Sequence, residues 1–281
     1  MTTTTADALA DIAAALQART VVPYVGPGCF ALLPDCPIPR NSEELVQRLN
    51  AKVAAPGRIR SNLTAVAQYI ESRRHRKTLE SILTEIFRAE VAPTPVHAWL
   101  ATLPAPELIV DVWYDGVLEA LLSDRAERTW GQIQGLSHPQ STGEWVRHYA
   151  PDGSEVRAEA AAGWQTILYK PSGSVSPAGN YLISDSDFVE VLTEIDIQSP
   201  IPPVVQQRRT AKHFLYLGCR FDAEIQRTFA RQIAKRSSDR HWAVIEGALS
   251  KNEARFLELH NIARVDLPLG EAVARLGAAA G

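Results

Sequence analysis

Short apolar runs that alternate with helical patterns predict an α/β fold, in which helices cover both faces of a parallel sheet. The alternation runs through the whole chain, from an amphipathic first helix to a closing helix near the carboxyl end. Three of the apolar runs end in glycine turns, at Gly26, Gly173 and Gly218. Because the carboxyl ends of parallel strands meet at one edge of a sheet, we expect these turns to share one cleft.

The first part of the chain combines helices with two strands. Leu9, Ile12 and Leu16 recur at helical spacing in the first helix. Asn41 is typical of a helix start, and a tight turn at 26–30 follows the first strand. The predicted helices cover 6–19, 41–49, 63–89, 93–103 and 117–121, and the predicted strands cover 21–25 and 108–113.

The second part repeats the alternation after a less regular segment. Scattered glycines, prolines and single charges at 130–164 favour weak strands or a cap insertion. Prolines break the chain at 200–203. Predicted strands cover 166–170, 213–217, 242–245 and 262–267, and predicted helices cover 184–192, 225–235, 252–260 and 271–276. We therefore expect one domain over residues 1–281, with a small cap or insertion at 130–165.

Composition excludes several classes of function. The chain has 281 residues, 46% of them hydrophobic, which is enough for one large core. A formal net charge of -3 gives no general attraction to nucleic acid or to an anionic membrane. No apolar run approaches the ~18 residues that span a bilayer, and the polar start is unlike a secretory signal, so we expect a cytoplasmic protein. A protein partner or a homo-oligomer remains open.

Four segments occur in the order typical of sirtuin-like proteins, which they resemble: 22–29, 109–119, 169–175 and 215–222. The resemblance implies a Rossmann-like core that binds a small nucleotide, NAD or an ADP-ribose-like ligand. Members of that family cleave the bond between nicotinamide and ribose, either to deacylate lysine or to hydrolyse NAD. The four-cysteine zinc module of the protein deacylases is missing here, which argues against a peptide deacylase.

The same resemblance assigns nucleotide-binding positions to the loops that follow the strands. Glycines in such loops let the backbone approach a phosphate closely, and helix N-termini supply amide donors. The assigned positions are Gly26, Pro27, Gly28, Cys29, Trp113, Ser172, Gly173, Gly218, Cys219 and Arg220.

Two of these positions depart from the family pattern. Trp113 replaces an asparagine that would hold ribose or water, and an indole offers one donor and no acceptor. Ser172 replaces a histidine that would accept a proton near neutral pH. The sequence thus predicts a catalytically impaired nucleotide-binding protein. The alternative is an NAD hydrolase with substituted residues, for which Asp111 and Asp115 are the candidates, although Asp115 is also placed to cap a helix.

The three cysteines suggest another alternative. Cys29 follows the first glycine turn, Cys36 lies a little beyond it, and Cys219 lies in the last turn. If the three thiolates converged at the cleft, they could hold an iron–sulfur cluster or a soft metal ion. Free cysteines in tight turns also serve as small buried apolar residues. His97 is a further candidate for a substitute catalytic residue, and a helix-surface or packing role is its alternative.

Overall fold

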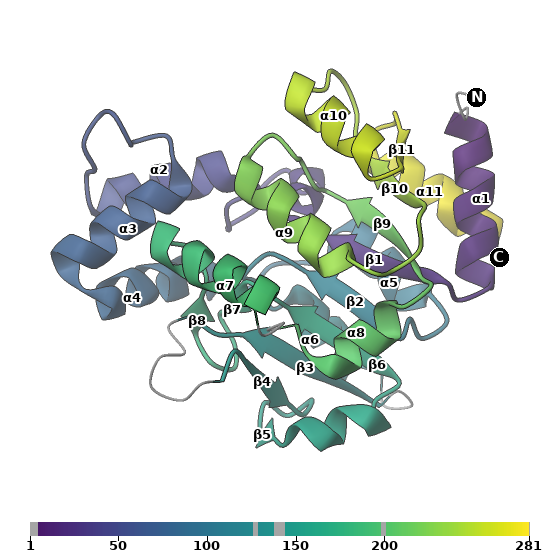
Figure 1. Cartoon of the computed structure of the whole chain (residues 1–281), viewed down its shortest axis with the longest axis horizontal. Helices are drawn as coiled ribbons and strands as arrows, with labels where there is room; N and C mark the ends of the chain where they lie inside the picture. The colour runs from purple at the N-terminus through teal and green to yellow at the C-terminus, as the bar shows by residue number, and fades with distance from the viewer. Residues whose placement is uncertain (1–4, 126–128, 138–143, 198–200, 281) are drawn as a thin grey trace.

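A computed structural model describes residues 5–125, 129–137, 144–197 and 201–280. Its centre is a nine-stranded sheet in the order β11-β10-β9-β1-β2-β6-β3-β4-β5, within these described ranges (Figure 1). The neighbours from β11 to β3 are parallel, and β4 and β5 are antiparallel additions. The strands are β1 Val21–Val25, β2 Leu108–Asp111, β3 Trp130–Gly135, β4 Val146–Tyr149, β5 Glu155–Val156, β6 Thr166–Lys170, β9 His213–Leu217, β10 His241–Val244 and β11 Ile262–Val265. The predicted α/β fold is confirmed.

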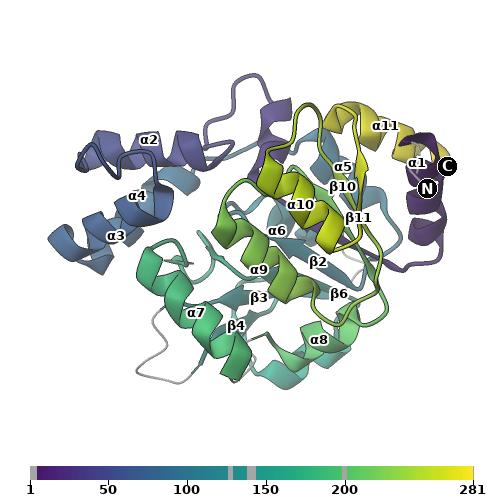
Figure 2. The same cartoon turned by 45° about the horizontal axis from the view of Figure 1, so that its top comes forward.

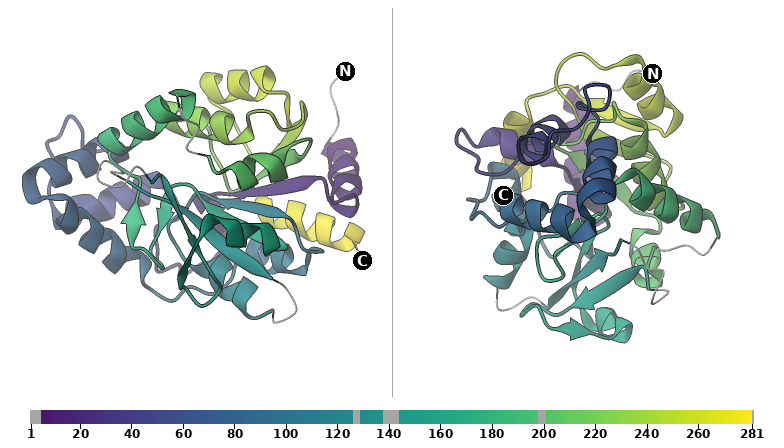
Figure 3. Two further views of the ribbon diagram at one scale, coloured as in Figure 1. Left: turned by 60° about the horizontal axis from the view of Figure 1, so that its bottom comes forward. Right: turned by 90° about the vertical axis from the view of Figure 1, so that its left-hand side faces the viewer.

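Side chains that alternate along the strands form two cores, one on each face of the sheet. In β1, for example, Val22 and Tyr24 join one core, whereas Val21 and Val25 join the other. The first core is covered by α7 Asp185–Ile197, α8 Pro203–Arg209, α9 Glu224–Ala234 and α10 Lys251–Leu259. The second core is covered by α1 Thr5–Gln17, α5 Pro95–Thr102, α6 Val117–Ser123 and α11 Leu269–Ala280. The left view of Figure 3 shows the sheet between these two helical layers.

A helical lobe lies beyond the carboxyl edge of the sheet, at the left of Figure 1. It consists of α2 Ser42–Lys52, α3 Leu63–Arg74 and α4 Arg76–Phe87, and it has its own apolar core. That core includes Trp113, Tyr114 and Tyr181, which come from the loops of the sheet. The lobe is therefore packed directly on the edge where the candidate site was expected.

The segment 63–89 is mostly helical as predicted, but it forms two helices because the chain breaks at His75. His75 adopts a φ of 68°, in the left-handed region, and separates α3 from α4. The next residue, Arg76, is only 17% exposed in its side chain and forms ion pairs with Glu71, Glu80 and Asp187. The guanidinium also donates to the carbonyl of Tyr181. The break thus lets Arg76 hold the lobe against α7, whereas its neighbours in the basic run are exposed.

The segment expected at 130–165 as weak strands or a cap supplies strands to the main sheet. β3 pairs with β6 in parallel, and β4 and β5 continue outward as a short antiparallel edge. Two elements were not expected from sequence. One is a two-stranded hairpin of β7 Gly173–Ser174 and β8 Asn180–Tyr181, and the other is α8, which begins at the proline break. None of the helices in the described ranges has the length and apolar character needed to cross a membrane.

Candidate functional site at the carboxyl edge

The four loops predicted to form the cleft do lie at one edge of the sheet. β1, β2, β6 and β9 are mutually parallel, and the loops follow their carboxyl ends. Gly26 follows β1, Trp113 lies two residues after β2, Ser172 lies two residues after β6, and Gly218 follows β9. The predicted common position of Gly26, Gly173 and Gly218 is therefore confirmed. Figure 2 shows this edge between the helical lobe and α9.

The loops after β1 and β9 are joined to each other by backbone hydrogen bonds. The amide of Gly26 donates to the Leu217 carbonyl at 2.9 Å, and the amide of Gly28 donates to the Gly218 carbonyl at 2.9 Å. The Cys29 amide donates to the Gly26 carbonyl at 3.3 Å, and Pro27 has no amide hydrogen. The amides expected to receive a phosphate are thus already paired.

The contact between the loops after β1 and β9 is called the seam below. Glycine is required in this seam because the two backbones touch. A Cβ on Gly26 would lie 2.7 Å from the Cys219 sulfur and 2.7 Å from the Gly218 carbonyl oxygen. Gly218 has a φ of 64°, and its Cβ would lie 2.4 Å from the Cys29 amide nitrogen. The glycines at Gly26 and Gly218 therefore serve close contact between loops, where the sequence suggested close contact with a phosphate.

The thiols of Cys29 and Cys219 point into the same seam. Cys29 Sγ donates to the Leu217 carbonyl at 3.6 Å, and Cys219 Sγ donates to that same oxygen at 3.5 Å. Burial raises the pKa of both thiols well above the usual value, so both stay protonated at neutral pH.

The three cysteines do not form the metal site that was one alternative. Cys36 belongs to the edge of the lobe core, away from the seam that holds Cys29 and Cys219. In the part of the chain that the structure describes, no three Cys, His, Asp or Glu side chains are grouped to hold a metal ion. Cys29 and Cys219 donate to backbone carbonyls and serve as packing groups in this arrangement, so the assignment of Cys29, Cys36 and Cys219 as ligands gains no support from the described residues.

Trp113 is packed into the core of the lobe. The residue is only 5% exposed, and its indole N–H donates to the Pro39 carbonyl at 3.0 Å. The ring centroid lies 5.5 Å from that of Phe87, at an edge-to-face angle, and 5.2 Å from that of Tyr114. The one polar atom of the indole is therefore used inside the protein, and the position presents no free polar group to a ligand.

A buried ionic cluster joins the end of β2 to the end of β6. Lys170 is inaccessible to solvent, and its Nζ donates to Asp111 Oδ2 at 2.8 Å and to the Asp115 carbonyl at 2.6 Å. Glu119 Oε1 lies 3.7 Å from the same nitrogen and accepts from Ser174 Oγ at 3.2 Å. Burial alone would lower the pKa of Lys170, but Asp111, Glu119 and Asp115 raise it above the usual value.

The candidate catalytic carboxylates both have structural partners. Asp111 is bound to Lys170 and also accepts the Trp113 amide at 3.0 Å. Asp115 accepts the amide of Val117, the first residue of α6, at 3.0 Å. His97 contributes to a capping box with Thr94 at the start of α5, and burial lowers its pKa to about 4. Ser172 is 5% exposed, and its carbonyl accepts the Leu182 amide.

Arg220 is a cation that faces solvent at this edge. Its side chain is 49% exposed, and it is oriented by Glu253, whose two carboxylate oxygens accept from Nε at 2.7 Å and from Nη2 at 2.8 Å. Pro27, Gly28 and Gly218 are partly exposed at the same edge, whereas Gly26 is buried. These exposed groups are the part of the predicted site that a ligand can reach.

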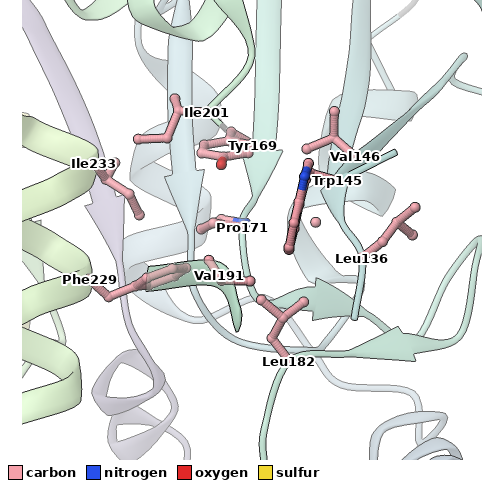
Figure 4. A pocket seen from close by; sticks show the side chains of 11 residues that line it. Leu136, Trp145, Val146, Tyr169, Pro171, Leu182, Val191, Ile201, Phe229 and Ile233 are labelled. Atoms are coloured by element: carbon pink, nitrogen blue, oxygen red, sulfur yellow. The ribbon is translucent and has the colours of Figure 1, made fainter. Parts of the chain in front are cut away.

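A small cavity lies beside the Ser172 segment, between the sheet and the helices α7 and α9 (Figure 4). Its volume is about 20 Å³, which holds one water molecule and excludes a nucleotide. Trp145, Tyr169 and Phe229 are among its mainly apolar lining residues.

Sequence reasoning missed three residues that hold this edge together: Lys170, Glu119 and Glu253. A signal for the first two was present, because a lysine that ends an apolar strand needs a carboxylate partner. Glu119 lies in the first turn of α6, close in sequence to Asp115, whose carbonyl also accepts from Lys170. Ser250 and Glu253 have the S-x-x-E spacing of a capping box, which is a signal for the helix start, but the pairing of Glu253 with Arg220 in the loop after β9 had none.

The sheet, its two helical layers and the glycine loops at its carboxyl edge define a mostly parallel α/β protein of the Rossmann-like class. A family model described as the SIR2-like domain matches residues 107–264, more than half of the chain. The chain therefore belongs to the SIR2-like family, and the sirtuin-like resemblance is confirmed. At the level of the family, this makes it an NAD-related protein. Among curated proteins, none matches the chain.

Proposed function

We propose that this protein is a SIR2-like nucleotide-binding protein that does not cleave NAD. The observation that carries the proposal is the packing of Trp113, whose indole N–H is bound to Pro39 and whose ring fills the lobe core. Ser172 supplies no base at neutral pH, and the nearby Asp111 and Asp115 are engaged by Lys170 and by the start of α6. Neither candidate carboxylate is therefore free to replace the positioning asparagine or the proton-accepting histidine of the family pattern.

The ligand class proposed is NAD or an ADP-ribose-like nucleotide, which binds at the exposed part of the carboxyl edge. Family membership supports this class. The first glycine loop has paired amides, so the phosphates would meet the guanidinium of Arg220 beside Gly28 and Gly218. Without amide donors from the first loop, we expect weak binding, on the order of 0.1–1 mM. The free cysteines fit a cytoplasmic location, which we propose as well.

The first experiment measures turnover and binding in the same preparation. Chromatography of NAD incubated with the protein should show negligible cleavage, and calorimetry should show weak binding of ADP-ribose. Turnover above ~1 per second, an ordinary enzyme rate, would contradict the loss of catalysis. An absence of binding at millimolar ADP-ribose would contradict the ligand assignment.

Arg220→Gln tests the proposed phosphate contact, with Arg275→Gln as the matched control. Arg275 is an exposed arginine on α11 that pairs only with its helical neighbour Glu271. We expect Arg220→Gln to weaken ADP-ribose binding about tenfold, the effect of losing about 1.4 kcal/mol, and the control to leave it unchanged. Thermal unfolding of both variants shows whether the fold is retained, because Arg220 also binds Glu253.

A further inference from the structure

A second concave surface lies between α9 and α10, on the outside of the first core. The two helices follow neighbouring parallel strands and run side by side in Figures 1 and 2. The groove between them has a volume of about 210 Å³. Its lining residues recur at helical spacing, so each helix presents one face to it. We call this surface the α9/α10 groove, and its residues are Glu224, Arg227, Thr228, Arg231, Asn252, Arg255, Phe256, Leu259 and His260.

The groove carries an excess of positive charge in a chain that is acidic overall. Three arginines line it, at Arg227, Arg231 and Arg255, against one carboxylate, at Glu224. Arg227 is held in place, since its guanidinium donates to the carbonyls of Phe221 at 2.7 Å and Asp222 at 2.6 Å. Such a cluster is unexpected beside a net charge of -3, because surface arginines in an acidic protein commonly find carboxylates.

Arg231 and Arg255 have no carboxylate partner within the described ranges. The hydrogen bonds and ion pairs of those ranges include neither guanidinium, and both residues are exposed. Burial lowers the pKa of His260 on the opposite side of the groove, and the positive charge of Arg231 lowers it further. Planar guanidiniums with unused donors are suited to bidentate contact with phosphate oxygens.

An apolar surface lies directly beside these cations. Phe256 forms the floor, and its ring centroid lies 4.7 Å from that of His260. Leu259 is 67% exposed, an unusual state for a large apolar side chain in this protein. The groove therefore offers a charged part for an anion and an apolar part for a flat or hydrophobic group.

We propose that the α9/α10 groove binds a small organic phosphate, with the phosphate on Arg231 and Arg255 and the organic group on Leu259 and Phe256. The proposal does not rest on the proposed function, because Arg220 and the glycine loops take no part in the groove. The volume accommodates a compact monoester but not a whole dinucleotide. Inorganic phosphate shares only the charged part of this chemistry.

Phenyl phosphate and inorganic phosphate are the two probes, titrated into the full chain by calorimetry at low ionic strength. We expect phenyl phosphate to bind in the range of about 0.1–1 mM and inorganic phosphate at least about fivefold more weakly. Arg231→Gln and Arg255→Gln should each weaken phenyl phosphate about tenfold. Lys251→Gln is the matched control, because Lys251 is an exposed cation on the same α10 that does not line the groove. This variant should bind as the wild type does.

Leu259→Ser separates the two parts of the groove without disturbing the core, since the side chain is exposed. It should weaken phenyl phosphate and leave inorganic phosphate unchanged. Arg231→Gln should leave ADP-ribose binding unchanged, which distinguishes this groove from the carboxyl-edge site. No binding at 10 mM phenyl phosphate, or equal losses in Arg231→Gln, Arg255→Gln and Lys251→Gln, would overturn the proposal.

Discussion

Glu253 is a charged residue with no solvent exposure, and its environment explains how that is possible. Its carboxylate accepts two bonds from Arg220, one from the Phe221 amide at 3.1 Å and one from the Ser250 amide at 2.9 Å. Burial raises the pKa of this group, but these donors outweigh it and lower the pKa to about 2. One side chain thus ties the loop after β9 to the start of α10.

The first prediction concerns acid stability. The pKa of Glu253 is lower in the folded protein than in the unfolded chain, where it is about 4.3. Its stabilisation is therefore complete above about pH 5 and is lost as the pH falls from there toward 2. We expect Glu253→Gln to lose about 2 kcal/mol at pH 7 and to show a smaller further loss between pH 5 and 3 than the wild type. Urea unfolding at several pH values measures both.

Glu271→Gln is the control for that experiment, since Glu271 forms an exposed pair with Arg275. It should change stability by less than about 0.5 kcal/mol at every pH. If Glu253→Gln followed the wild type over the whole acid range, the carboxylate would not be the group that titrates.

At the residue scale, sequence was sufficient to detect the replacements at Trp113 and Ser172, but not their surroundings. A tryptophan at a ligand position is consistent with stacking on a base or with filling the pocket. Only the contacts with Pro39 and Phe87, both distant in sequence, decide between the two.

Among the elements, the loops after β1 and β9 behave as one unit. The Gly28 amide, the Gly218 carbonyl and the thiols of Cys29 and Cys219 fill the space between them. Anything larger than hydrogen at Gly218 has to separate the two backbones. The seam is thus closed by packing in addition to its hydrogen bonds.

Gly218→Ala tests that packing, with Gly247→Ala as a control for the backbone alone. Both glycines have a positive φ, 64° and 79°, but a Cβ at Gly247 would meet no atom within 4 Å. We expect Gly247→Ala to cost about 1 kcal/mol, the strain of a left-handed alanine, and Gly218→Ala to cost at least about 3 kcal/mol. Equal losses in chemical unfolding would show that the loops are free to separate, and would reopen the first glycine loop as a phosphate site.

Elements that follow local patterns were predicted well, and those that depend on distant partners were not. The strands at 21–25, 166–170 and 213–217 have the predicted bounds, because each is a short buried run between turn signals. The break at His75 was missed, since a left-handed histidine is stabilised there by the ion pairs of Arg76 with Asp187 and others. The metal alternative gains no support from the structure for a related reason: spacing along the chain did not reveal that two of the thiols face a packed seam.

For the molecule as a whole, the parallel sheet and its covering helices could be deduced, but the order of the strands could not. β1 lies in the interior of the sheet, between β2 and β9, as the fourth of the nine strands in the described ranges. The helical lobe over the carboxyl edge was likewise not expected. The interior position of β1 and the lobe over the carboxyl edge together explain why loops that match the family pattern do not line an open cleft.

The central position of β1 has a consequence for how the chain is made. Its partner on one side, β9, is synthesised almost two hundred residues later, with Val21 opposite His213. Until then the middle of the future sheet is an exposed edge of an apolar strand, open to pairing with other chains. Such long-range pairing is also slow, because the intervening chain must be closed into a loop first.

We therefore expect refolding from denaturant to protect the amides of β1 and β9 together, and later than those of the local helix pair α3 and α4. Pulsed hydrogen exchange with mass spectrometry resolves this order. Full protection of β1 ahead of β9 would contradict it. Because β1 pairs with β9, the nascent chain cannot complete its sheet until β9 has been synthesised. Chaperone binding would protect the exposed edge of β1 during that time.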